Sequence, residues 1–391
     1  MKDVTIIHIF NDDKFINPVI KLFENVAPNI SKYFVLKQDN FPVKFCNNPK
    51  LIRINFFEKT ESDNFIKLIC NQNTIVFFHS LEDYKIYIAL NIPESIKKVW
   101  FIWGYDLYGW YPFRYKKFES ETAKLLGLQL KFKHNVFSFI WLNKVFFPTF
   151  IVNKIKSHFT TPFYKAVKKM NYVVPVVPTE YKLAKQINKE LICLPFTYGF
   201  LEDLVSKEVL NVINETTEQN ILMGNSADPS NNYVELFIKL AKLNLGARKV
   251  YVPLSYGGTE NYIEAILQKG KEILGDNFFP LTTFLSLEEY NTILNSCNTL
   301  LFNHTRQQGV GNIITMLYYG KKVYLNEKST VFKYYKSLGV KLFSSNQVSY
   351  ESLNTLLSKT DVEKNKDLML KYYGKITVEE KVREMIKTLK V

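Results

Sequence analysis

The tract with the clearest chemical meaning is Arg306–Asn312 (RQQGVGN), which joins an apolar, strand-like run to a helix-like run. A strand that passes through a glycine-containing turn into a helix directs free backbone N–H groups and the positive end of the helix dipole to one place, where anions bind. Arg306 adds a guanidinium suited to phosphate oxygens, and Gly309 and Gly311 let a diphosphate approach the backbone. An ordinary turn explains a lone GxG pattern equally well, so the flanking segments decide.

Two further loops of small residues open at the same expected sheet edge. GNSADPSNN (224–232) lies between a strand-like and a helix-like run, and LSYGGTEN (254–261) follows another strand-like run. Turn and capping chemistry alone could explain such residues. Together with the Arg306 tract, however, they predict a nucleotide-binding cleft. The residues that we assign to this cleft are Gly224, Asn225, Ser226, Asp228, Asn231, Tyr256, Arg306, Gln307, Gln308, Gly309, Gly311 and Asn312.

Polar residues also accompany the ends of three apolar strands in the first half of the chain. The first strand contains His8, His79 follows the second, and Asp106 follows the third in the segment WFIWGYDLY. Carboxyl ends of parallel strands share one edge, where open α/β sheets bind their ligands. Asp106, His8 and His79 are therefore the candidate acids or bases, with Asp106 ranked first. For each of them a satisfied core histidine or a helix cap is an equally good explanation.

Strands and helices alternate along the chain, which predicts an α/β protein with parallel sheets. We expect an N-terminal domain at 1–205, a polar linker at 206–219 and a C-terminal domain at 220–391. The order of elements from 287 to 325 resembles the nucleotide-binding half of GT-B glycosyltransferases. That resemblance implies two Rossmann-like domains whose parallel sheets face a central cleft. Many GT-B enzymes carry two glutamates where this chain has Gln307 and Thr315, so a generic retaining member fits poorly.

The composition of the 391 residues, 47% hydrophobic and 23% charged, is that of a globular protein. Four scattered cysteines indicate a reducing compartment, and the first residues lack a signal-peptide pattern, so we expect a cytoplasmic protein. The net charge of +14 is unevenly placed, because the segment Thr122–Thr179 has no acidic residue and alternates lysines with aromatics. This pattern suits anionic lipid, whereas a solvated basic face is the simpler explanation. No apolar run there approaches the roughly 20 residues that cross a bilayer, and no nucleic-acid-binding motif is present.

Six segments recur in the order of a known family: HIFNDDKF (8–15), VFFHS (76–80), WFIWGYDLY (100–108), GNSADPSNN (224–232), VPLSYGGTENYI (252–263) and RQQGVGN (306–312). Together they resemble the 4-alpha-L-fucosyltransferases of glycosyltransferase family 56, the TDP-N-acetylfucosamine:lipid II N-acetylfucosaminyltransferases of enterobacterial common antigen synthesis. The resemblance implies a dTDP-sugar donor, an undecaprenyl-diphosphate-linked acceptor and a peripheral seat on the cytoplasmic face of the bacterial inner membrane. It implies no cofactor and no nucleic acid partner.

For such a transfer, Arg306 and the helix N-terminus at 309–312 would neutralise the departing diphosphate. Asn225 and Ser226 would donate hydrogen bonds, while Tyr256 and Gln307 would contact the nucleoside or the sugar. The chain has no DxD motif, so we expect no metal and assign the positive charge to the protein itself. The sequence leaves open whether the anomeric configuration is inverted or retained.

Two other functions compete with this one. A nucleotide-sugar 2-epimerase has the same two-domain architecture, but it lacks a basic, aromatic face of this size and uses acidic and histidine residues that this sequence does not display in a recognisable pattern. A non-catalytic basic protein that binds lipid or nucleic acid leaves the phosphate-type loops unexplained.

Overall fold

The computed structural model describes residues 4–37, 42–70, 73–109, 117–127, 161–205 and 219–389. These residues form two compact units. The described part of unit 1 comprises 4–109, 161–200 and 375–389, with the gaps given above, and that of unit 2 comprises 117–127 and 201–374 with its gap. The predicted linker at 206–219 lies outside the described residues except for Gln219.

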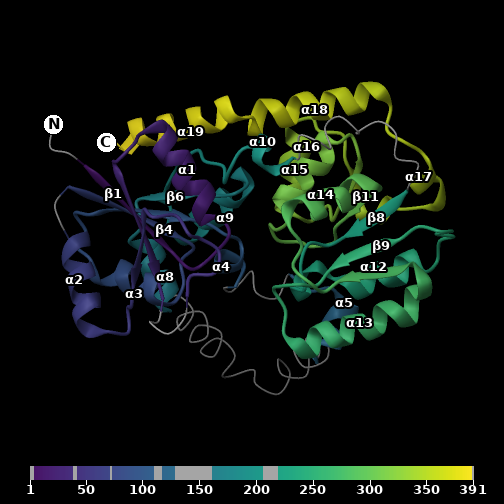
Figure 1. Ribbon diagram of the computed structural model, residues 1–391, viewed down its shortest axis with the longest axis horizontal. Helices are drawn as coiled ribbons and strands as arrows, with labels where there is room; N and C mark the ends of the chain where they lie inside the picture. The colour runs from purple at the N-terminus through teal and green to yellow at the C-terminus, as the bar shows by residue number, and fades with distance from the viewer. Residues whose placement is uncertain are drawn as a thin grey trace, which may run out of the picture. The chain divides into compact units, whose positions relative to one another are not determined.

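Unit 1 is built on a seven-stranded parallel sheet in the order β3-β2-β1-β4-β5-β6-β7. Figure 1 labels β1, β4 and β6 of this sheet. Its strands are β1 (Thr5–Phe10), β2 (Ser31–Leu36), β3 (Leu51–Ile54), β4 (Thr74–His79), β5 (Lys97–Phe101), β6 (Tyr172–Val174) and β7 (Ile192–Cys193). Its helices are α1 (Ile16–Val26), α2 (Lys59–Ile69), α3 (Asp83–Asn91), α4 (Tyr105–Tyr108), α8 (Pro162–Lys168), α9 (Tyr181–Ile187) and α19 (Lys375–Leu389).

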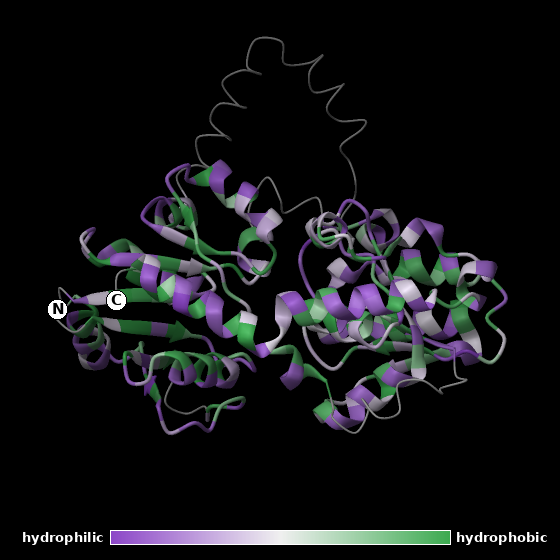
Figure 2. Ribbon diagram, turned by 90° about the horizontal axis from the view of Figure 1, so that it is seen from above, coloured by the Kyte–Doolittle hydropathy of each residue, from purple (hydrophilic) through white to green (hydrophobic). Residues whose placement is uncertain are grey.

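The central strands of unit 1 are mostly apolar because both faces of a parallel sheet are covered. All residues of β4 are buried, and the strands stand out as hydrophobic ribbons in Figure 2. Alternate residues, including Ile6 and Phe10 of β1, share one core with Val19 and Phe23 of α1. His8 lies between Ile6 and Phe10 in this alternation, so its ring enters the core beside Phe23.

Unit 2 is built on a six-stranded parallel sheet in the order β10-β9-β8-β11-β12-β13. Its strands are β8 (Asn220–Met223), β9 (Val250–Pro253), β10 (Phe278–Leu281), β11 (Cys297–Leu301), β12 (Lys322–Leu325) and β13 (Phe343–Ser344). Its helices are α5 (Ser120–Leu125), α10 (Leu201–Leu204), α12 (Tyr233–Leu240), α13 (Glu260–Leu274), α14 (Leu287–Ser296), α15 (Val310–Tyr318), α16 (Thr330–Ser337), α17 (Tyr350–Asn354) and α18 (Lys359–Tyr373).

The two units exchange short pieces of chain, which the predicted boundaries do not include. Helix α19, at the C-terminal end of the sequence, belongs to unit 1, where Val378, Val382 and Met385 join the core of α1 (Figure 1). Helix α5, which precedes residue 205, belongs to unit 2. There the Glu235 carboxylate of α12 accepts hydrogen bonds from the backbone N–H groups of Glu121 and Thr122 at 2.8 Å. Two helices therefore pack with the sheet that is distant from them in sequence.

Candidate active site

Each sheet has one point where the strand order reverses, and both points carry candidate residues. In unit 2 the connection from β8 leads to one side of the sheet and that from β11 to the other. The loops after these two strands, 224–232 and 302–309, therefore leave neighbouring strands and open outward. Open α/β sheets bind ligands at this switch point, outside the carboxyl ends of the strands.

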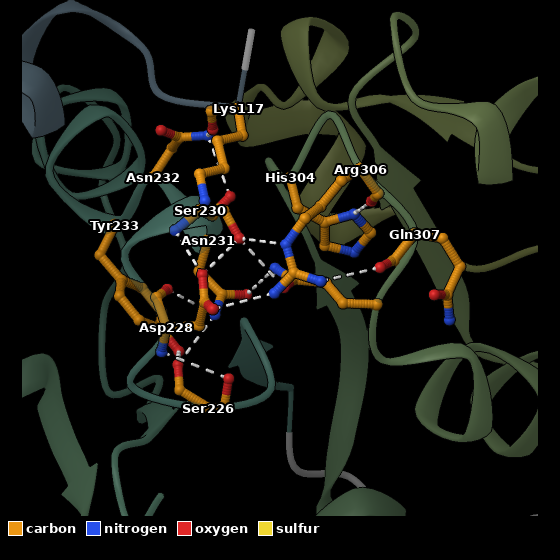
Figure 3. Close-up of polar contacts among 11 residues, drawn as sticks. Lys117, Ser226, Asp228, Ser230, Asn231, Asn232, Tyr233, His304, Arg306 and Gln307 are labelled. Atoms are coloured by element: carbon orange, nitrogen blue, oxygen red, sulfur yellow. Dashed lines mark hydrogen bonds and ion pairs between the residues drawn. The ribbon is translucent and has the colours of Figure 1, made fainter. Parts of the chain in front are cut away.

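Arg306 joins the two loops of unit 2. Its Nη2 forms an ion pair with Asp228 Oδ2 at 2.9 Å, its Nε donates to Ser230 Oγ at 2.8 Å, and its Nη1 donates to the Gln307 carbonyl at 3.1 Å. Figure 3 shows the guanidinium lying between the Asp228 loop and the Gln307 backbone. The side chain is only 8% exposed, so the protein fixes its orientation.

The guanidinium expected to bind phosphate oxygens is therefore already paired with a carboxylate in this structure. Burial raises the pKa of Asp228, but the Arg306 charge and hydrogen bonds from Ser230 outweigh it and hold that pKa below its ordinary value. Asp228 is thus an anion at neutral pH and balances part of the Arg306 charge. A diphosphate that binds here either replaces this carboxylate as the partner of Arg306 or binds to Arg306 beside it.

The amide side chains predicted for the donor are held in the same network. Gln308 Nε2 donates to Asn231 Oδ1 at 3.1 Å, and Asn231 Nδ2 donates to the Ser226 carbonyl at 2.8 Å. The first contact joins the two loops, and the second lies within the 224–232 loop. By contrast, Asn225 Oδ1 and Gln307 Oε1 are buried and have no hydrogen-bond partner within the described part of the chain.

His304 adds a third such atom and was not anticipated from the sequence. Its Nδ1 lies 2.7 Å from the Arg306 carbonyl, which only accepts, so Nδ1 carries the proton and Nε2 is an acceptor. Among the described residues, Nε2 has no partner. Burial and the Arg306 charge lower the pKa of His304 to about 3, so the ring is neutral at physiological pH.

Helix α15 begins where the glycine tract predicts. Its N-cap is Gly309 at φ 62°, with no side-chain cap, so the N–H groups of the first turn receive no capping side chain. A Cβ on Gly309 would lie 2.7 Å from the Phe302 ring, so the protein itself requires this glycine. A Cβ on Gly311 would meet only Leu204 at 3.8 Å, an ordinary contact. Asn312 turns its amide to the Tyr290 hydroxyl at 2.8 Å.

The third loop packs on the first through glycine. The Ala227 N–H donates to the Tyr256 carbonyl at 2.7 Å, and a Cβ on Gly258 would lie 2.5 Å from the Ala227 carbonyl oxygen. Gly224 has the same constraint, since its Cβ would lie 2.3 Å from the Tyr233 hydroxyl. The Tyr256 side chain is 42% exposed beside these loops. All twelve residues assigned to the donor thus lie in unit 2 on three loops and the start of α15.

The predicted histidines of unit 1 are buried in a hydrogen-bonded chain. His8 Nδ1 lies 3.0 Å from His79 Nε2, and His79 Nδ1 lies 3.0 Å from the Tyr198 hydroxyl. Both rings are 0% exposed. Burial lowers the pKa of His8 to about 3 and that of His79 well below its ordinary value. Neither ring is presented to a substrate in this structure.

Asp106 is buried as well, and both of its oxygens are occupied. Oδ2 accepts from the Leu81 N–H at 3.0 Å and Trp100 Nε1 at 2.8 Å, and Oδ1 accepts from the N–H groups of Trp103 and Leu107 at 3.0 Å. Burial raises the pKa of Asp106 to about 6, although these hydrogen bonds partly offset the rise. The arrangement favours a structural role, in which Asp106 holds the ends of β4 and β5 together.

The strand ends of unit 1 also bring together residues that were not predicted as site residues from the sequence. Asn11, Ser80, Glu82, Lys85 and Tyr105 form one polar cluster after β1, β4 and β5. Tyr105 lies inside the WFIWGYDLY segment, and Glu82 lies two residues beyond VFFHS, so both signals were adjacent to quoted motifs. What the sequence could not give was the exposure of each side chain.

Two other expectations concern metal and membrane. In the described residues, no group of three or more His, Cys, Asp or Glu side chains is arranged to hold a metal ion. Over the same residues, no helix has the length and apolarity to cross a bilayer. Most of the acid-free segment, including Lys154 and Lys156, lies outside the described residues. Its described helix α8 buries Phe163 and Tyr164, so these two aromatics belong to the core and leave Lys165 and Lys168 exposed.

Solved structures share this architecture at low sequence identity. Sucrose-phosphate synthase from Thermosynechococcus elongatus is 12% identical, with a TM-score of 0.62 and 99% of each chain covered. HepE from Anabaena, solved with UDP-glucose, is 9% identical, with a TM-score of 0.63 over 98% of this chain and 99% of its own. A glycosyltransferase from Rickettsia africae is 11% identical, with a TM-score of 0.61 over 100% and 99%. The fold is therefore the GT-B fold of glycosyltransferases, as the order of elements predicts.

A match to a protein family is more specific than the fold. Residues 181–366 match the model described as 4-alpha-L-fucosyltransferase glycosyl transferase group 56. These residues contain the three loops of unit 2 and helix α15. Over these residues the chain is similar to glycosyltransferase group 56, and the match confirms the family resemblance for the motifs at 224–232, 252–263 and 306–312.

Proposed function

We propose that the protein transfers a deoxy-amino sugar, 4-acetamido-4,6-dideoxygalactose or a close relative, from a dTDP-sugar to an undecaprenyl-diphosphate-linked saccharide. This step belongs to the synthesis of a cell-surface polysaccharide of the enterobacterial common antigen or O-antigen type. The family supports the glycosyltransferase activity. Support for a sugar diphosphate comes from the site in unit 2, where a helix N-terminus without a side-chain cap and Arg306 accompany three acceptor atoms that have no partner among the described residues.

These protein groups fit a ligand that carries both a diphosphate and hydrogen-bond donors on a sugar. The diphosphate would receive hydrogen bonds from the N–H groups at the start of α15, near the positive end of the helix dipole. Sugar hydroxyl or amide N–H groups would supply donors to Asn225 Oδ1 and Gln307 Oε1. Because leaving groups depart more easily when their charge is stabilised, the same N–H groups and Arg306 would favour release of dTDP.

A nucleotide panel tests the donor. We expect dTDP to raise the melting temperature more than dTMP, dTMP more than thymidine, and dTDP more than UDP or GDP. At a concentration of about 100 times Kd, the stabilisation would be about 2.7 kcal/mol. No stabilisation by any nucleoside diphosphate contradicts the function, whereas a preference for UDP contradicts only the choice of base. Mass spectrometry of a lipid-linked disaccharide acceptor incubated with the dTDP-sugar then detects the transferred sugar directly.

We also propose that the protein works at the cytoplasmic face of the inner membrane, as a lipid-linked acceptor requires. The lysines of the acid-free segment would attract anionic lipid by a force that physiological salt screens beyond about 8 Å. Wild-type protein should sediment with anionic vesicles at low salt. Neutralising Lys154, Lys156, Lys165, Lys168 and Lys169 together should release it at moderate salt without weakening dTDP binding. A wild-type protein that ignores vesicles at low salt contradicts this seat.

A further inference from the structure

The polar cluster of unit 1 lies at the point where its strand order reverses. β1 continues through α1 to β2 on one side, whereas β4 continues through α3 to β5 on the other. Asn11 follows β1, and Ser80 and Glu82 follow β4, so the cluster occupies the edge at which such sheets bind ligands. The site residues that the sequence predicts in unit 1 do not include these polar side chains.

Within this cluster Glu82 has one fixed oxygen and one open oxygen. Oε1 accepts from Asn11 Nδ2, from the Tyr105 hydroxyl at 2.5 Å and from the Ser80 hydroxyl at 3.2 Å. No donor among the described residues reaches Oε2, and the side chain is 27% exposed. The carboxylate is therefore oriented by the protein on one side and available to a ligand on the other.

A buried lysine supplies the compensating charge. Lys85, 1% exposed, donates to Asn11 Oδ1 at 2.9 Å, to the His79 carbonyl at 2.7 Å and to Ser80 Oγ at 2.7 Å. These three bonds use all of its donors, so its ammonium stays in place, 3.8 Å from Glu82 Oε1. Burial lowers the pKa of Lys85 to about 8, and the nearby carboxylates of Glu82, Asp106, Asp83 and Asp13 oppose that fall.

The other candidate bases of this edge lack an open atom. Both oxygens of Asp106 accept two hydrogen bonds each, and the side chain is buried. His8 and His79 bond to one another and are fully buried. Glu82 is thus the carboxylate of the cluster that combines a fixed position with access to solvent.

We propose that Glu82 is the general base that takes the proton from the acceptor hydroxyl, with the 39% exposed ring of Tyr105 forming a wall for the acceptor sugar. This assignment rests on the proposed sugar transfer. In that step the acceptor oxygen bonds to C1 of the donor sugar as its proton passes to Oε2. The bond from C1 to the diphosphate oxygen breaks, and its electron pair leaves with dTDP.

Glu82→Gln tests the assignment because the amide keeps an oxygen for Asn11 and Tyr105 but cannot take a proton. We expect kcat to fall by about 10² or more, with the KM for the dTDP-sugar and the thermal shift by dTDP unchanged. Glu94→Gln, on an exposed glutamate of the same unit, is the matched control and should behave as wild type. Tyr105→Ala should raise the KM of the acceptor and leave that of the donor unchanged.

Rescue of a variant by a small carboxylate distinguishes a catalytic role of Glu82 from a role in packing. Formate should restore part of the activity of Glu82→Ala, since a free carboxylate can occupy the vacated space, and should not restore Tyr105→Ala. If Glu82→Gln keeps kcat within about threefold of wild type, or if formate rescues nothing while dTDP binding falls in parallel, Glu82 is not the base. A wild-type protein that transfers no sugar from any nucleotide donor overturns the proposed function together with this assignment.

Discussion

At the scale of single residues, the ion pair between Arg306 and Asp228 sets the charge offered to a diphosphate. Removing Arg306 leaves Asp228 as an unbalanced anion in the site, so two effects act in the same direction. We expect Arg306→Ala to weaken dTDP by about 1.5 to 3 kcal/mol and thymidine far less. Calorimetric titration with both ligands measures this, and Lys269→Ala, on an exposed lysine of unit 2, is the control.

The same ion pair predicts the opposite effect on dTDP affinity when Asp228 is changed. Asp228→Asn preserves the oxygen that caps the turn at Ser230 but removes the negative charge. We expect dTDP to bind at least as tightly as in wild type, with some loss of thermal stability. Weaker binding of dTDP by Asp228→Asn would mean that the carboxylate contacts the donor itself.

The buried carboxyl of Asp106 predicts how the stability of the protein depends on pH. Its pKa of about 6 in the folded protein exceeds the ordinary 3.8, so the folded state binds more protons between these values. Its contribution to stability therefore rises as pH falls through 6. Asp106→Asn puts an amide against paired N–H donors and should lower stability at pH 7. The deficit should grow by about 1 kcal/mol at pH 5, as denaturant titrations at both pH values would measure.

At the scale of elements, the start of α15 is the part of the site best predicted from sequence. Gly309 and Gly311 look equivalent in RQQGVGN, yet the protein needs only Gly309 for its own packing. Gly311→Ala should leave stability unchanged or raise it by up to about 1 kcal/mol, because alanine favours a helix. It should nevertheless weaken dTDP if a diphosphate lies against that backbone. Unchanged dTDP affinity would move the phosphates away from Gly311.

Elements with a strong local pattern were predictable, and those decided by distant contacts were not. The sequence predicts a helix at 16–26, a strand at 220–223, a helix at 287–296 and a strand at 322–325, and the structure has α1, β8, α14 and β12 there. These predictions succeed because apolar periodicity and capping residues such as Ser286 act locally. No element is predicted from the sequence between 264 and 286, where the structure has most of α13 and all of β10. The burial of Asp106 depends on donors from Leu81 and Trp100, which belong to other elements, so no local pattern reveals it.

At the scale of the whole molecule, α19 ties the C-terminal end of the sequence to unit 1. Four of its side chains are 0% exposed in the core shared with α1, namely Val378, Val382, Met385 and Leu389. The Lys97 ammonium also donates to the Leu389 carbonyl at 2.7 Å. A sequence-based division at 206–219 assigns this helix to the C-terminal domain, because its amphipathic pattern does not show which core receives it.

Met385→Ala distinguishes the two assignments. Removing a buried methionine side chain should destabilise unit 1 by about 2 to 5 kcal/mol. Hydrogen exchange should then accelerate in β1 and α1 and stay unchanged in β8 and β11, and dTDP should still stabilise unit 2. Lys387→Ala, on the exposed face of the same helix, should leave every segment as in wild type. Exchange accelerates in the unit whose core contains Met385. Faster exchange in β8 with β1 unaffected would therefore mean that α19 packs in the C-terminal domain.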